Sequence, residues 1–147
     1  MVIANQLLNI LHTINTIGKM GSLNEQLFAA IESGKVDEVA TLLKNGAKID
    51  TKDAQGRTAL IKTASLGKIH IIKVLLAKKA KIDVKDGSGW APLVHTFAKF
   101  RLDGAKLLMS KGAKASVADK YICSALNLMM KLGDKKTARH IDANLTE

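Results

Sequence analysis

The sequence repeats itself with a period of 33 residues, and this constrains the fold more than any other feature. Two residue types recur at that interval along most of the chain: Asp53, Asp86 and Asp119, and Leu27, Leu60, Leu93 and Leu126. A repeat of this length is one supersecondary unit, and such units stack so that each contacts only its neighbours. The period therefore predicts a solenoid of similar units.

Each unit contains two helical stretches followed by a turn. Residues 69–78 show the second stretch most clearly, because Ile71, Val74 and Leu75 recur at helical spacing. The Asp/Gly-rich segments 53–56 and 86–89 have the composition of tight β-turns. Apolar residues make up 47% of the chain but aromatic residues only 3%, so we expect a core of Ala, Leu, Ile and Val.

A family motif can be followed through the units. Repeat 2 carries Asp53, Gly56, Thr58, Leu60, Ala64, Gly67, Leu75, Leu76 and Ala80. Repeat 3 carries Asp86, Gly89, Pro92, Leu93, Leu108, Gly112 and Ala113. These residues resemble the ankyrin repeat over about residues 22–143. The resemblance implies an all-α solenoid of helix-turn-helix pairs joined by β-turn or hairpin loops. Its repeats would span about 22–52, 53–85, 86–118 and 119–147, with the first and last acting as caps.

The chain departs from the family motif at its histidine. Ile61, Val94 and Asn127 stand where the motif has His. The side chain that usually makes a polar tie between neighbouring repeats is therefore missing.

A second departure concerns glycines that close helices. Gly46 and Gly112 are expected to end the second helices of repeats 1 and 3 in the left-handed conformation. Lys79 holds the equivalent position in repeat 2, so we expect it to be a non-glycine residue with positive φ. Phe100 replaces another glycine of the motif.

The N-terminal segment 1–21 is expected to be an amphipathic helix that precedes the repeat domain 22–147. One stripe of this helix would carry Ile3, Leu7, Ile10, Leu11, Ile14 and Ile17. Ser22 and Glu25 have capping-box spacing and would begin the first repeat helix. We favour a helix that covers the open side of repeat 1, with dimerisation or membrane contact through the stripe as alternatives.

The segment does not look like a signal peptide, because no basic residue precedes Lys19 and polar residues interrupt the apolar run. No apolar run approaches the roughly 18 residues of a membrane span. A single cysteine, Cys123, cannot form an internal disulfide. We therefore expect a cytoplasmic protein, with a secreted effector as the alternative.

No catalytic, cofactor-binding or metal-binding constellation is expected. The histidines are scattered among different repeats, and no metalloprotease, nucleophile-elbow or phosphate-binding motif occurs. A nucleophile pair of Cys123 with His95 is conceivable, but an isolated thiol on a turn explains Cys123 better.

A protein-binding surface is better supported. In ankyrin stacks, as the resemblance implies, the turn tips and the exposed face of each first helix form a concave binding face. The residues mapped to it are Gln55, Arg57, Leu66, Ser88, Trp90, Lys99, Lys120, Tyr121 and Lys131. Trp, Tyr and Arg dominate binding hot spots. Trp90 packing on its own turn is the structural alternative.

The formal net charge of +10 is best explained by a solvated surface, with an acidic protein partner, or nucleic acid or anionic lipid, as alternatives. Lysines and arginines stack in rows, as Lys48, Lys81 and Lys114, as Lys35, Lys68 and Arg101, and as Lys73, Lys106 and Arg139. The leading hypothesis is a monomeric, non-enzymatic module that binds another protein as an adaptor, inhibitor or effector. The alternative is an electrostatic binder of nucleic acid or anionic membrane through the lysine rows.

Overall fold

The computed structural model of the chain describes residues 3–7, 21–116, 122–124, 127, 131, 133–143 and 145–146. They belong to two compact units, Met1–Lys48 and Ile49–Glu147. The first unit contains α2 (Leu23–Ser33) and α3 (Val36–Lys44). The second contains α4 (Ala59–Leu66), α5 (Ile69–Ala77), α6 (Pro92–Ala98), α7 (Leu102–Ser110), β1 (Ala115–Ser116), α9 (Lys135–Asp142) and β2 (Leu145–Thr146).

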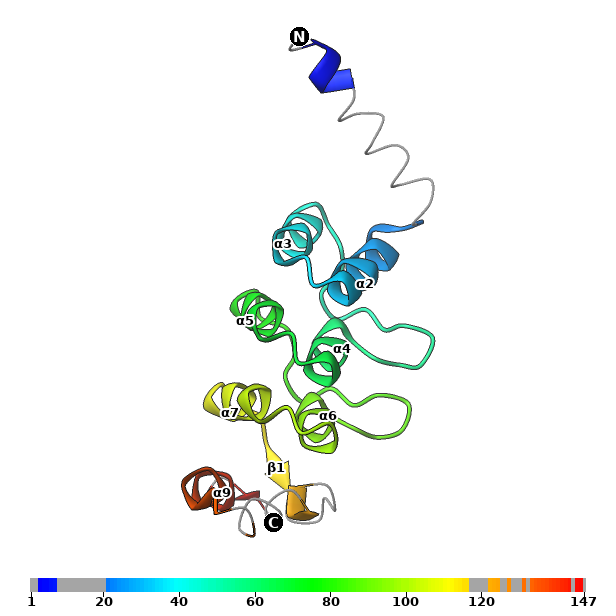
Figure 1. The fold of residues 1–147 in the computed structure, drawn as a ribbon. Helices are drawn as coiled ribbons and strands as arrows, with labels where there is room; N and C mark the ends of the chain where they lie inside the picture. Colours follow the sequence, from blue (N-terminus) through cyan, green and yellow to red (C-terminus); the bar gives the residue numbers. More distant parts are fainter. Residues whose placement is uncertain are drawn as a thin grey trace. The chain divides into compact units, whose positions relative to one another are not determined.

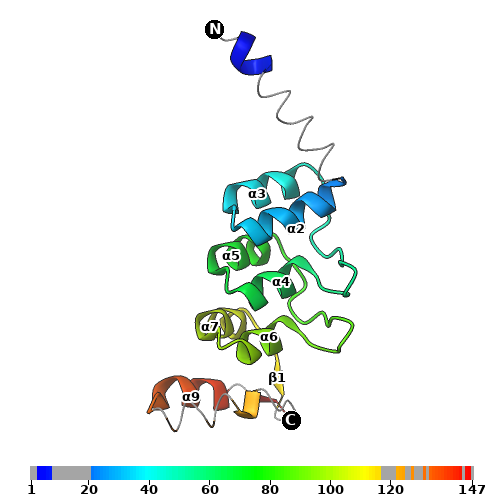
Figure 2. The ribbon, with the colours of Figure 1, turned by 45° about the vertical axis from the view of Figure 1, so that its right-hand side comes forward.

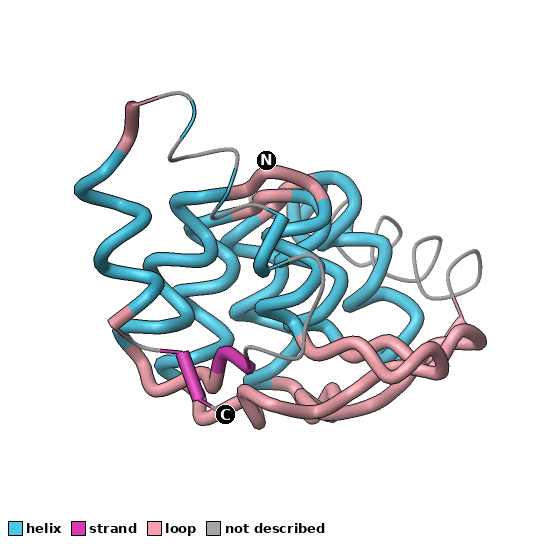
Figure 3. Tube along the Cα trace, turned by 90° about the horizontal axis from the view of Figure 1, so that it is seen from below, coloured by secondary structure: helices cyan, strands magenta, loops and turns pink. Residues whose placement is uncertain are grey.

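Pairs of adjacent helices, α4 with α5 and α6 with α7, repeat along the second unit (Figure 1). Helix α4 packs against α5 and α6, and α7 packs against α6 and α5. The views in Figures 1 and 2 place α4 and α6 between the long loops on one side and α5 and α7 on the other. In Figure 3 the loops of this unit run together along one edge of the helices. The predicted all-α arrangement of helix pairs is confirmed.

Local sequence signals explain where the helices begin. Ser22 accepts a hydrogen bond from the Glu25 amide (3.3 Å), and the Glu25 carboxylate accepts one from the Ser22 amide (3.3 Å), which is the expected capping box. Thr58 caps α4 by accepting from the Ile61 amide (3.3 Å). Helix α6 has no such cap but begins with Pro92, whose missing N–H is not needed there.

The core of the second unit is aliphatic with one large aromatic residue. Leu60, Ile71, Leu75 and Leu108 are fully buried, and so is the ring of Phe97. The composition therefore predicted the core apart from this phenylalanine.

Ile61 and Val94, which replace the motif's histidine, are both buried.

Aspartate side chains make some of the polar connections between successive repeats. Asp50 accepts a hydrogen bond from the Lys81 amide (3.0 Å). Asp83, 33 residues later, accepts one from the Lys114 amide (3.2 Å). Each of these amides lies in the segment that follows the second helix of a repeat, where no helical carbonyl is available as acceptor, and the aspartate provides one.

The predicted tight turns are present at both Asp/Gly segments. The Gly56 amide donates to the Asp53 carbonyl oxygen and the Gly89 amide to the Asp86 carbonyl oxygen, each at 3.0 Å. This is the hydrogen bond that closes a β-turn.

Two non-glycine residues with positive φ occur in the described part of the chain, Lys79 (φ 65°) and Phe100 (φ 55°). Gly46 and Gly112, at the positions equivalent to Lys79, have φ of 108° and 94°. The predicted positive φ of Lys79 is therefore confirmed. A side chain with a Cβ is strained by roughly 1–2 kcal/mol in the left-handed region.

The N-terminal segment is described only at residues 3–7, which are helical, with Ile3 and Leu7 exposed. The rest of the expected stripe lies outside the described residues, so the capping helix stays a prediction. None of the helices in the described ranges has the length and apolar character needed to cross a membrane.

Replacing Lys79 by glycine should stabilise the protein by roughly 0.5–1 kcal/mol, because it removes the left-handed strain while the freer unfolded chain offsets part of the gain. Gly112→Lys is the matched reverse change and should destabilise by a comparable amount. Urea unfolding of both variants measures the difference. Equal stability of Lys79→Gly and wild type would contradict the strain at this position.

Candidate protein-binding face

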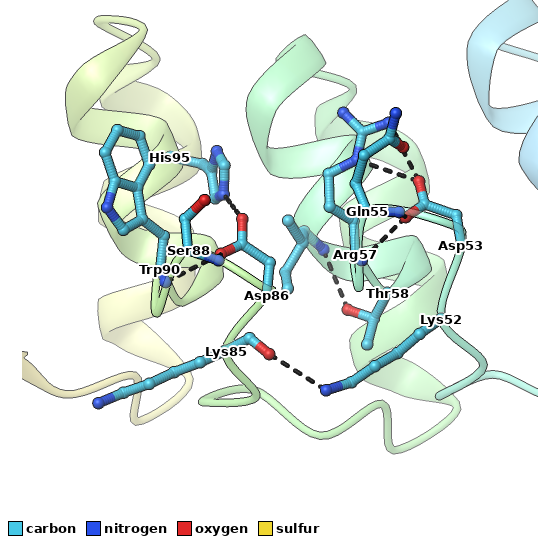
Figure 4. Close-up of polar contacts among 11 residues, drawn as sticks. Lys52, Asp53, Gln55, Arg57, Thr58, Lys85, Asp86, Ser88, Trp90 and His95 are labelled. Atoms are coloured by element: carbon cyan, nitrogen blue, oxygen red, sulfur yellow. Dashed lines mark hydrogen bonds and ion pairs between the residues drawn. The ribbon is translucent and has the colours of Figure 1, made fainter.

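The turn of residues 53–57 is organised by one aspartate (Figure 4). Asp53 Oδ1 accepts hydrogen bonds from the amides of Gln55 and Arg57, both at 2.9 Å. Its Oδ2 accepts from Arg57 Nε at 3.0 Å and forms an ion pair with Arg57 Nη2 at 3.0 Å. Burial would raise the pKa of Asp53, but these donors outweigh it and hold the pKa below its ordinary value.

The same contacts fix the arginine that the sequence assigns to the binding face. Arg57 Nη2 also donates to Gln55 Oε1 at 2.9 Å, so the guanidinium is held by two neighbours while its side chain remains partly exposed. Part of the rotamer entropy that binding would cost is therefore already lost in the free protein.

The turn of residues 86–90 repeats this design with a different partner. Asp86 Oδ1 accepts from the amides of Ser88 (2.9 Å) and Trp90 (3.0 Å), and its Oδ2 lies 2.8 Å from His95 Nε2. The Asp86 and His95 side chains are only 7% and 11% exposed. Burial would raise the pKa of Asp86, but the Trp90 amide, the His95 side chain and the Ser88 amide together lower it.

Trp90 lies over this pair. Its ring meets the His95 ring edge-on, with centroids 5.2 Å apart and planes at 62°. The ring is half-buried rather than fully exposed. Trp90 therefore packs partly on its own repeat and presents its remaining surface beside the turn, which combines the two readings that the sequence allowed.

The two turns are linked to each other. The Gly87 amide donates to the Gln55 carbonyl oxygen (3.3 Å), and Lys52 Nζ donates to the Lys85 carbonyl oxygen (3.2 Å). Arg57 and Trp90, 33 residues apart, thus stand at equivalent places on adjoining, hydrogen-bonded turns (Figure 4).

The structure brings part of the predicted residue set together. Gln55 with Arg57, and Ser88 with Trp90, form the two turn tips. Leu66 ends α4, and Lys99 directly follows α6 at the equivalent position; both are exposed. Lys131 is exposed, whereas Lys120 and Tyr121 lie outside the described residues.

Two residues were missed or misjudged at the sequence level. His95, considered only as a partner of Cys123, pairs with Asp86 instead. Phe100 was noted as a missing glycine, yet it is also a large exposed apolar side chain, 52% accessible. The replacement of a motif glycine by an aromatic residue was the signal that could have identified it.

Two rows of basic residues have members on or directly before α5 and α7. Lys73 and Lys106 are exposed on α5 and α7, on the opposite side of the helices from the loops in Figure 1. Lys68 and Arg101 directly precede these helices and make no side-chain cap. In the described ranges, no group of three His, Cys, Asp or Glu residues is placed to hold a metal ion.

Comparison with known proteins agrees with the pattern of repeated helix pairs. A family model for ankyrin repeats, in three copies, matches residues 27–119. The chain belongs to the ankyrin-repeat family. Ankyrin repeats are generally protein–protein interaction modules, and the family is typically non-enzymatic. A comparison with curated proteins gives no match.

The matched range covers three ankyrin repeats and ends at residue 119. The fourth ankyrin repeat expected at 119–147 lies beyond it and stays a prediction, although residues 122–124 and α9 are helical.

Loss of the carboxylate in the ankyrin turn should be costly. Asp86→Asn should lower the free energy of unfolding at neutral pH by roughly 1–3 kcal/mol, because the buried charge-assisted hydrogen bonds are weakened. Since the pKa of Asp86 is lowered on folding, its stabilisation is present above the ordinary value of 3.8 and is lost as pH falls through the lower folded value. The variant should therefore lose less stability than wild type over that acid range.

Urea unfolding across the acid range checks this prediction. Asp103→Asn removes the same charge from an exposed site in the first turn of α7 and serves as the control. The prediction is wrong if the Asp86 and Asp103 variants behave alike.

Proposed function

We propose that this protein is a non-enzymatic binding module that recognises another protein through the concave face formed by its turn tips and first helices. The observation that carries the proposal is the pair Arg57 and Trp90, presented one repeat apart on turns fixed by Asp53 and Asp86. Arg and Trp are enriched in binding hot spots. Rigid presentation lowers the entropy lost on association.

Phe100, which follows Lys99 at the end of α6, adds an exposed apolar side chain to the proposed face. Its backbone is strained and its ring is exposed, so neither backbone geometry nor core packing accounts for a phenylalanine there. Strained residues persist where function uses them. Leu66, 39% exposed at the end of α4, provides a second apolar contact in the preceding repeat.

An adaptor, an inhibitor and an effector would all use such a face, and all three remain within the proposal. We further propose that the chain acts as a cytoplasmic monomer and that segment 1–21 caps the first repeat.

Electrostatic binding of nucleic acid or anionic membrane is the second candidate, favoured by the net charge of +10. Its residues are the basic rows, of which Lys73 and Lys106 lie on α5 and α7. Binding through phosphates weakens steeply with salt, whereas a hot-spot interface loses little.

Single alanine variants test the proposed face. Affinity capture from matched cell lysate with the wild-type protein identifies the partner, and titration then gives its affinity for Arg57→Ala and Trp90→Ala. We expect Trp90→Ala to cost on the order of 2 kcal/mol of binding. The free energy of unfolding should change by less than about 1 kcal/mol, because an edge contact between two rings contributes about that much.

Lys81→Ala, an exposed change outside the proposed set of face residues, is the control and should bind as wild type does. A large loss of stability in Trp90→Ala, or equal affinity of all variants, would show that Trp90 serves packing instead. A steep salt dependence with no effect of the tip variants would favour the electrostatic function.

A further inference from the structure

The outer helices of the second unit enclose a hollow that plays no part in the turn face. It measures about 280 Å³ and is lined by Lys73, Leu76 and Ala77 of α5 and by Leu107 and Lys111 at the end of α7. Figures 1 and 2 show α5 and α7 side by side on the side of the unit opposite the loops.

The packing of the two helices explains why the hollow lies near their C-terminal ends. Near the start of α7, Gly104 packs against α6 and α5: a Cβ there would lie 3.2 Å from Thr96 and in ordinary contact with Ile69 (3.7 Å) and Ile72 (3.8 Å). Farther along, the side chains that face the core are Leu75 and Leu108, which are fully buried. The hollow lies on the next face of each helix, and its lining residues all come from α5 and from α7 with the residue that follows it.

The floor of the hollow is apolar although it faces outward. Lys73, Leu76 and Ala77 are spaced i, i+3 and i+4 and therefore share one face of α5, as Leu107 and Lys111 do on α7. Leu76 and Leu107 are half-buried and Ala77 is exposed. The exposed part of these two leucines and Ala77 offers an apolar contact to a side chain from outside.

The rim of the hollow is cationic. No carboxylate in the described part of the chain forms an ion pair with Lys73 or Lys111, and both side chains are exposed. Residues 53–85 carry eight basic and two acidic residues, a net charge of +6.

Two sources of negative charge lie near the lysines of the rim, and both are weaker than the positive charge of these lysines. Asp103 is the acidic residue on α7, one turn before Leu107 and toward the other end of the helix. The helix C-termini add about half a negative charge each. The exposed Lys78, which directly follows α5, and Lys106 on α7 offset these contributions.

From this combination we propose that the hollow between α5 and α7 binds an acidic, amphipathic segment of a partner protein. An apolar side chain of that segment enters the hollow, and flanking carboxylates meet Lys73 and Lys111. The size is at the lower end of ligand pockets, which begin at about 300 Å³, and suits one or two side chains. A nucleic-acid backbone would use the lysines but has no apolar group for Leu76 and Leu107.

A designed peptide provides the probe. It has about 15 residues, enough for a marginal helix, with leucines on one face and glutamates on the others, and carries a fluorophore for anisotropy. Wild-type protein should bind it. A peptide with serines in place of the leucines, and one with lysines in place of the glutamates, should each bind at least about tenfold more weakly.

Two pairs of substitutions locate the site. Lys73→Glu with Lys111→Glu should weaken binding at least about tenfold. Lys81→Glu with Lys114→Glu makes the same change in net charge at exposed positions outside the hollow and should leave binding close to wild type. Ala77→Gln fills the hollow without changing charge and should also weaken binding. Thermal unfolding checks that each variant is folded.

Several results would overturn the proposal. These are no binding of the leucine–glutamate peptide to wild type, equal binding of its serine counterpart, and equal weakening by the two charge-reversal pairs. A labelled DNA duplex is the competing probe. If duplex binding depends on Lys73 and Lys111 and peptide binding does not, the hollow is part of an electrostatic nucleic-acid site.

Discussion

The regular structure of the second unit depends on aspartate side chains that accept backbone N–H groups. Asp53 and Asp86 each hold two amides of their own turn, and Asp50 and Asp83 each hold an amide 31 residues farther along the chain. Amides in turns and after helices have no helical partner, and an unpaired buried one costs free energy. Because the four carboxylates recur every 33 residues, each repeat is closed internally and joined to the next by the same chemistry.

This arrangement changes at the end of the third repeat. Ser116 stands at the register of Asp50 and Asp83, so the carboxylate is absent there. At that place the backbone of β1 pairs in parallel with β2, with Ala115 opposite Leu145 and Ser116 opposite Thr146. At the register where the earlier repeats have an aspartate hydrogen bond, the chain thus has backbone pairing with the C-terminal segment. A solenoid needs an atypical terminal unit, and this change fits that need.

Most of the fold could be predicted from the sequence because its determinants are local. The period places the helix pairs, Ser22 and Glu25 give the start of α2, and the register of Gly112 assigns a positive φ to Lys79. The candidate site could be predicted only as a set of positions. That His95 would reach Asp86 and lie against Trp90 depends on how α6 is placed relative to its turn, which no spacing rule specifies. The hollow between α5 and α7 depends on packing between residues at least 30 positions apart.

The two turns also show how an ankyrin scaffold can vary its surface while keeping its backbone. In the first, residue 57 has two duties, since Arg57 holds Asp53 Oδ2 and also faces the exterior. In the second, His95 from α6 takes over the contact with Asp86 Oδ2, so residue 90 needs to supply only its amide. A tryptophan, which could not neutralise the carboxylate, can then occupy the position. The backbone hydrogen bonds of both turns are the same, and the side chain offered to a partner changes from a cation to an aromatic ring.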